Sequence, residues 1–254
     1  DLYVNSSESS FGRSAQQGGD IEASIGDGGS ISVGGSLSLL SDGFATEGEF
    51  GTEAFGGRAV LAMTGGNANL SVGQQLTISA QARPFFQNCE CFPPPSGSAT
   101  GGYAALTATG GTIEAGSLNV SASAEAFSSF YGEPDANLDA MGGTALVSLG
   151  DSTASFSSIT VSADAQGASA PQGPDGGDAF GGAASFSKGA GGSFATQGLV
   201  VSADAAGGDG GDPDGEGQSA TRGGNAEGGT ASIALSQSPD GLGYLDLSAR
   251  AQAG

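Results

Sequence analysis

The amino-acid sequence predicts an all-β protein, a parallel β-solenoid (β-helix) of about six to seven repeats of about 40 residues each. Three observations lead to this fold class. A glycine pair followed by alternating apolar residues recurs along the whole chain. A second apolar anchor follows each copy at a similar distance. The segments between copies are rich in Gly, Ser and Asp, which are typical of turns and loops.

The first predicted strand of each repeat begins just after the glycine pair. The third, fifth and seventh residues after the first glycine are apolar in all copies, except at Lys188. Alternation with a period of two is typical of a strand with one buried face. The pairs begin at Gly18, Gly56, Gly101, Gly142, Gly181 and Gly228.

Two further apolar groups complete the repeat. A short middle pair, such as Ile31 and Val33 or Leu70 and Val72, precedes the second anchor. The anchor consists of two aliphatic residues that are two positions apart. We therefore expect three short strands per repeat. The anchors begin at Leu2, Leu37, Leu76, Leu118, Ile159, Leu199 and Leu245.

Stacking explains why such repeats would form one body. Three short strands cannot bury an apolar face alone, so neighbouring repeats must cover it. Stacked coils place equivalent residues about 4.8 Å apart, which is the strand spacing of a sheet. We expect alanine at the third position to suit a narrow corner, and glycine at the corners to supply positive φ. Residues 1–254 are thus predicted to form a single elongated domain, either a segment of a longer array or a filament subunit.

Composition and charge exclude several function classes. The chain has 27 acidic residues against six basic ones, a net charge of −21. Nucleic acid is therefore an unsuitable partner, because phosphate binding needs clustered Lys and Arg. The same charge argues against docking on anionic membranes, and no apolar run approaches the ~20 residues of a membrane span. The chain contains no histidine and one lysine, so it lacks the usual groups of acid–base and nucleophilic catalysis, and we expect no enzyme activity.

The segments between repeats vary while the strands recur. They are roughly 10 to 20 residues long, which favours protruding loops. If these loops emerge on one side, that side is the expected functional face.

Calcium is the one cofactor that these loops suggest. Gly207–Asp212 fits half of a Gly-Gly-x-Gly-x-Asp calcium repeat, and further carboxylates follow. Hard cations take carboxylate and backbone oxygens on such glycine loops. Solvated acidic turns are the alternative interpretation. The candidate ligands are Asp209, Asp212, Asp214 and Glu216.

Cys89 and Cys91 are the only cysteines, and they lie in a loop beside Phe85, Phe86 and Phe92. A zinc site would need further ligands, and the chain has no histidine or third cysteine to supply them. A strained disulfide between the two, a bridge to another molecule and two free thiols all remain open. The aromatic residues of this loop suggest a small satellite core or a partner contact.

The motif Gly-Gly-x-Ala-x-Leu followed by Leu-x-Val-Ser-Ala-x-Ala resembles the β-strand repeats of large bacterial exoproteins, the filamentous-haemagglutinin-like and autotransporter-like proteins. That resemblance covers essentially the whole chain. It implies an extracellular or cell-surface location and an adhesive, fibrous or matrix-forming role, and it carries over no catalytic residue.

Two function hypotheses follow. The first is a structural extracellular fibre, adhesin or biofilm-matrix protein that associates with itself end to end, because neither end shows a polar capping repeat. The second is a carbohydrate-binding or carbohydrate-active solenoid that meets a surface polysaccharide. It would need a lateral groove of aligned acids and aromatic residues, for which Phe127, Phe130, Tyr131 and Phe180 are the candidates.

Overall fold

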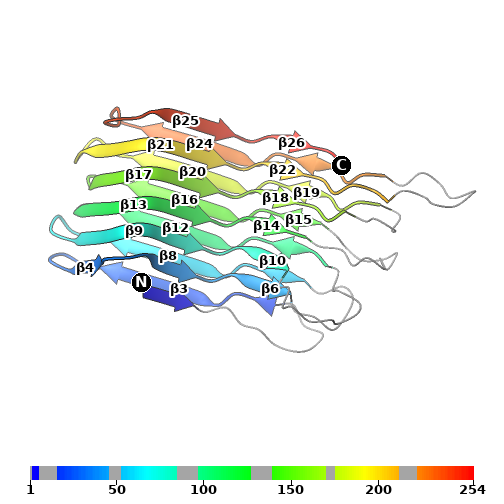
Figure 1. Ribbon diagram of the computed structural model, residues 1–254, viewed down its shortest axis with the longest axis horizontal. Helices are drawn as coiled ribbons and strands as arrows, with labels where there is room; N and C mark the ends of the chain where they lie inside the picture. The colour runs from blue at the N-terminus through cyan, green and yellow to red at the C-terminus, as the bar shows by residue number, and fades with distance from the viewer. Residues whose placement is uncertain are drawn as a thin grey trace, which may run out of the picture.

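The computed structural model describes residues 2–5, 16–45, 53–84, 97–126, 139–169, 175–211 and 222–254. The described residues form four parallel sheets and no helix, so the predicted all-β parallel solenoid is confirmed. In each coil the chain passes once through each of the four sheets, and successive coils stack in chain order from β3 to β25 (Figure 1).

Sheet I is the broadest of the four. Its middle strands are nine to eleven residues long. Here the predicted middle pair and second anchor belong to one continuous strand, so two of the three predicted strands merge. The strands are β1 (Leu2–Asn5), β5 (Leu37–Leu40), β9 (Asn69–Ser79), β13 (Thr112–Ser121), β17 (Thr153–Ser162), β21 (Phe194–Ser202) and β25 (Tyr244–Ser248), with β4 (Ser30–Val33) pairing beside β9.

Sheet II contains the strand that follows each glycine pair. Its strands are β3 (Asp20–Ile25), β8 (Arg58–Met63), β12 (Tyr103–Ala108), β16 (Thr144–Leu149), β20 (Ala183–Lys188) and β24 (Thr230–Leu235). The register pairs Ala104 with Ala59 and Ala145, and Leu106 with Leu61 and Val147, so the predicted columns are confirmed.

The two remaining sheets are narrow and were not predicted as separate strands. Sheet III contains β2 (Gln16–Gln17), β7 (Ala54–Phe55), β11 (Ala99–Thr100), β15 (Ala140–Met141), β19 (Ala179–Phe180) and β23 (Ala226–Glu227). Sheet IV contains β6 (Gly43–Ala45), β10 (Ala82–Pro84), β14 (Ala124–Glu125), β18 (Ala165–Gln166), β22 (Ala205–Ala206) and β26 (Ala251–Gln252).

The interior is divided into two lobes. The wide lobe, between sheets I and II, holds the larger aliphatic side chains, including Leu61, Leu106, Ile78 and Val161. The narrow lobe, between sheets III and IV, holds buried residues that are all alanine. Sheets III and IV lie too close together for larger side chains. This second core therefore contains no Leu, Ile or Val pattern from which it could be predicted.

The glycine pairs form the waist between the lobes. Gly102 donates its N–H across the interior to the Ala80 carbonyl at 2.7 Å, and Gly143 donates to Ala122 at 2.7 Å. A Cβ on Gly101 would lie 1.9 Å from the Ala122 oxygen. These glycines permit close approach of two backbones.

Positive φ occurs elsewhere in the coil. The described glycines with positive φ lie in the turns between sheets II and I or at their ends, as at Gly65 and Gly111. The prediction that corner glycine supplies positive φ therefore holds for that turn. It is wrong for the glycine pairs, whose role is steric.

Lys188, the exception in the apolar columns, points into the wide lobe and is buried. Its ammonium donates to the carbonyl oxygens of Gly150 and Gly189, both at 3.0 Å, and to that of Gly191. Desolvation lowers the pKa of Lys188, although nearby Asp151 opposes this shift. The side chain thus reaches the end of its column and binds the backbone of the following turn and of the equivalent turn one coil earlier.

Candidate functional site

The predicted loop segments attach to the solenoid at one place. Residues 46–52, 85–96, 127–138, 170–174 and 212–221, which lie outside the described residues, each follow a strand of sheet IV and precede a strand of sheet III. Their attachment points therefore share one edge of the stack, where the strands of sheet IV end and those of sheet III begin.

A row of polar residues precedes sheet IV at its corner with sheet I. We call it the corner row, and it consists of Asp42, Gln81, Ser123, Asp164, Asp204 and Arg250. Neighbouring members belong to neighbouring coils, because the residues that follow them are paired in register.

The carboxylates of this row bind the backbone of the next coil. Asp164 accepts the Asp204 N–H at 2.8 Å on Oδ1 and the Ser202 hydroxyl at 3.0 Å on Oδ2. Asp204 accepts the Arg250 N–H at 2.6 Å and the Ser248 hydroxyl at 2.9 Å in the same way. Each aspartate thus satisfies a backbone donor at a corner, where strand pairing is interrupted.

The same device recurs at other corners. Asp42 of the corner row accepts the Gln81 N–H in the same way. Elsewhere, a backbone N–H of the following coil is accepted by Asp27, Asp139, Asp151, Asp175 and Asp178. The sequence predicts acidic turns that are either solvated or calcium-binding, and this structural role of the aspartates was not predicted. The recurring pattern Ser-Ala-Asp-Ala at Ser162–Ala165 and Ser202–Ala205 was the available signal.

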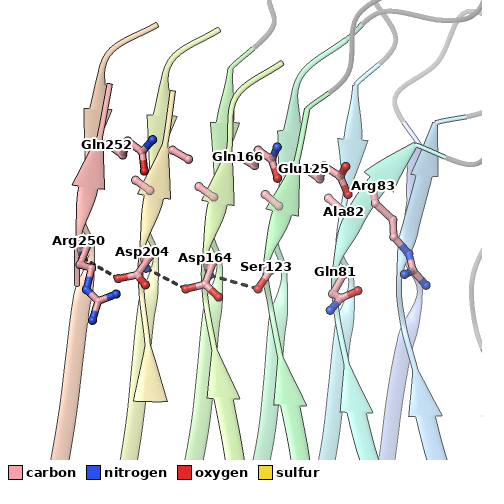
Figure 2. A pocket seen from close by; sticks show the side chains of 14 residues that line it. Gln81, Ala82, Arg83, Ser123, Glu125, Asp164, Gln166, Asp204, Arg250 and Gln252 are labelled. Carbon is pink, nitrogen blue, oxygen red and sulfur yellow. Dashed lines mark hydrogen bonds between the residues drawn. The ribbon is translucent and has the colours of Figure 1, made fainter. Parts of the chain in front are cut away.

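A groove with a volume of about 470 Å³ runs beside the corner row. Two rows of side chains flank the backbone of sheet IV, as Figure 2 shows. The first is the corner row. The second contains Arg83, Glu125, Gln166 and Gln252, with Ala206 among them. The groove offers carboxylate oxygens and amides at its centre and guanidinium groups at both ends.

Asp164 is half-buried and lies at the middle of the corner row. Desolvation raises its pKa, and the Asp204 carboxylate also raises it, whereas hydrogen bonds from the Asp204 N–H and the Ser202 hydroxyl oppose the shift. The folded protein therefore binds this proton more tightly than the unfolded chain does. At pH values between the pKa of Asp164 in the unfolded chain and its higher pKa in the folded protein, the contribution of Asp164 to the free energy of unfolding falls as the pH rises.

We expect Asp164→Asn to gain stability relative to the wild type as the pH rises from 3 to 7. Asparagine keeps an oxygen for the Asp204 N–H but carries no desolvated charge. Asp164→Ala should instead lose about 1–2 kcal/mol, because the Asp204 N–H loses its acceptor. Urea unfolding across this pH range measures both effects, with Asp246→Asn as a control for charge. A constant difference between Asp164→Asn and the wild type would contradict the assignment.

The calcium and cysteine predictions fall largely outside the described residues. Asp212, Asp214, Glu216, Cys89 and Cys91 all do. Asp209 is described and exposed, and its N–H donates to the Ser169 hydroxyl at 3.2 Å. Within the described ranges no group of three or more His, Cys, Asp or Glu residues could hold a metal ion. Calcium at Asp209–Glu216 stays a prediction.

The predicted aromatic surface is described only in part. Phe127, Phe130 and Tyr131 lie outside the described residues, whereas Phe180 is half-buried in β19 of sheet III and does not line the groove. The nearest described aromatic contact is at one end of the groove, where the Arg83 guanidinium lies 5.5 Å from the Phe44 ring centre.

The two ends of the stack form the other candidate surface. Leu245 and Leu247 of β25 are 52% and 51% exposed, although they occupy the columns in which Leu199 and Val201 are fully buried. At the opposite end Leu2 and Val4 of β1 are 46% and 42% exposed. These apolar side chains are exposed because no further described coil covers them.

The fold and these surfaces define an all-β parallel solenoid with an acidic lateral groove and with exposed apolar side chains in β1 and β25. Comparison with models of protein families, with curated proteins and with solved structures finds no match to the chain. In the described part of the chain, no helix has the length and apolar character needed to cross a membrane.

Proposed function

We propose that this protein is a structural solenoid of an extracellular fibre, adhesin or matrix, which associates end to end with further copies of itself. The observation that carries this proposal is the exposure of matching apolar columns at both ends of the stack. Leu245 and Leu247 continue the same columns of sheet I as Leu2 and Val4. The extracellular location rests on the resemblance to large exoproteins.

Open parallel strands favour such association. The outer strands β24 and β25 pair on one side only among the described residues, and an unpaired strand edge is a template for another strand. Burying the exposed leucines of β25 removes apolar surface from water, at about 25 cal/mol per Å². The net charge of −21 opposes association, so added salt should strengthen it.

We expect light scattering and electron microscopy to show longitudinal oligomers of the wild type that grow with protein concentration and with salt. Leu245→Asp/Leu247→Asp places charges in the exposed columns and should leave monomers. The double variant Asn119→Asp/Ser148→Asp adds the same charge on outward positions of central coils and should assemble like the wild type. Assembly of the β25 variant equal to that of the wild type would overturn the proposal.

The groove on sheet IV supports a second candidate, binding of a neutral polysaccharide along the stack. Its carboxylates and amides could accept and donate hydrogen bonds to sugar hydroxyls. This candidate ranks below self-association because the groove's lining, among the residues that the structure describes, includes no aromatic side chain on which a sugar ring could stack.

A further inference from the structure

One lateral side of the solenoid carries an uncharged patch. β16 and β20 are neighbours in the middle of sheet II, and β15 and β19 are neighbours in sheet III (Figure 1). In these strands buried side chains alternate with outward ones. We call the outward group the lateral patch, and it consists of Met141, Thr144, Leu146, Phe180, Ala183 and Ser185.

Met141 exposes apolar surface in the middle of the stack. Outside β1 and β25, the large apolar side chains of the described residues that are exposed are Met141, at 51%, and Leu242, at 36%. In the register of sheet III, Met141 lies beside Phe180, which is half-buried. Met and aromatic side chains are enriched in the cores of protein interfaces, where charged side chains are depleted. The composition of the lateral patch therefore favours contact with another macromolecule.

The charge of the chain favours a second copy as the occupant of this patch. A net charge of −21 opposes the approach of two copies wherever carboxylates face each other. The lateral patch contains no carboxylate, whereas the groove beside sheet IV presents Glu125, Asp164 and Asp204. A neutral ligand could approach either surface. Another copy of this acidic chain can approach only the uncharged one without repulsion.

A two-fold axis along the strands, placed between β16 and β20, makes the lateral patch self-complementary. Such an axis keeps each column in place and exchanges the two coils, so the same patch on two copies forms an isologous contact. Met141 of one copy then faces Phe180 of the other, and Leu146 faces Ser185. The thioether of methionine packs favourably against an aromatic ring. The larger Leu146 side chain is opposed by a small hydroxyl.

The coils on either side fit the same arrangement. β12 would face β24, so that Tyr103 meets Thr230. Among the described outward positions of sheets II and III in these coils, the one charged residue is Glu227, and it would face Thr100. With a rise of about 3.3 Å per residue and about 4.8 Å between coils, the contact would cover about 600 Å² per copy. Typical specific interfaces bury about 800 Å² per partner, so single chains should form a weak dimer.

We propose that two copies pair side by side through the lateral patch, with their stacks antiparallel. This inference goes beyond the proposed end-to-end association and does not depend on it. Where copies also associate end to end, the contact recurs along two filaments. The avidity of repeated weak contacts then strengthens the lateral pairing.

The test uses Leu245→Asp/Leu247→Asp as the parent chain, so that lateral pairing is measured without longitudinal growth. Sedimentation velocity should show a dimer whose fraction rises with protein and salt concentration. Met141→Asp or Phe180→Lys, added to the parent, should each raise the dissociation constant about tenfold or more, because each buries a charge against an apolar side chain. A mixture of the two variants should dimerise like the parent, because the new carboxylate of one copy then faces the new ammonium group of the other.

Ser155→Asp is the matched control. Ser155 is exposed on the outer face of sheet I, so this substitution adds the same charge on the other side of the solenoid and should leave the dimer unchanged. Circular dichroism and the melting temperature check that Met141→Asp and Phe180→Lys are folded.

Loss of the dimer in each folded variant and its recovery in the mixture support the lateral pairing. A parent chain that stays monomeric, a dimer that persists in both variants, or a mixture without recovery overturns it. A monomeric parent that binds an insoluble neutral polysaccharide such as cellulose, and loses this binding on Met141→Asp, would assign the lateral patch to a polysaccharide and overturn the pairing as well. The longitudinal oligomers of the wild type are tested separately, so either proposal can fail without the other.

Discussion

Placing aspartate at Val147 should destabilise the solenoid by about 4 kcal/mol or more, because a charge would enter a dry column without a partner. Val147 is fully buried in β16, between Leu106 of one neighbouring coil and Phe186 of the other. Such a column offers neither water nor a hydrogen-bond donor to a carboxylate. Thermal and urea unfolding, followed by circular dichroism, measure the loss.

The matched control is Ser148→Asp, one residue further along the same strand. Ser148 points outward and accepts a hydrogen bond from the Ser187 hydroxyl at 3.3 Å, a role that a carboxylate can fill. We expect a change below about 1 kcal/mol. Equal damage from both substitutions would refute the strand register, since a shift of one residue exchanges the inner and outer faces.

Gly101→Ala should cost about 3 kcal/mol or more, because the waist between the lobes has no room for a methyl group. The added Cβ would lie 1.9 Å from the Ala122 oxygen and 2.6 Å from the Gly143 nitrogen. Relief of this overlap would separate Gly143 from Ala122 and break their 2.7 Å hydrogen bond across the interior. The melting temperature should therefore fall by several degrees.

Gly34→Ala is the matched control for this prediction. A Cβ at Gly34 meets nothing within 4 Å, and Gly34 is not among the glycines with positive φ. The substitution should be neutral or stabilise by up to about 1 kcal/mol, because alanine restricts the unfolded chain more than glycine does. A Gly101→Ala protein as stable as Gly34→Ala would show that the two walls do not meet at the waist.

The candidate surfaces were accessible to sequence reasoning to different degrees. The regular last copy, in which Ala231, Ile233 and Leu235 keep their columns, predicts apolar side chains in the end strands. The groove could not be predicted, because Asp164, Asp204, Glu125 and Gln166 come from different coils and gather only when sheet IV is in register.

Period-two alternation and a repeat of about 40 residues were enough to predict the solenoid and its columns, because they constrain both strand faces and stacking. The tertiary structure was needed to establish how each coil closes. Alanine and glycine carry too little apolar surface to give a hydrophobic pattern, so sheets III and IV and the waist could not be predicted from the sequence. Their positions depend instead on how closely two backbones can approach. The tertiary structure also decided the role of the acids, since a carboxylate such as that of Asp204 finds its N–H donor a whole coil away in sequence.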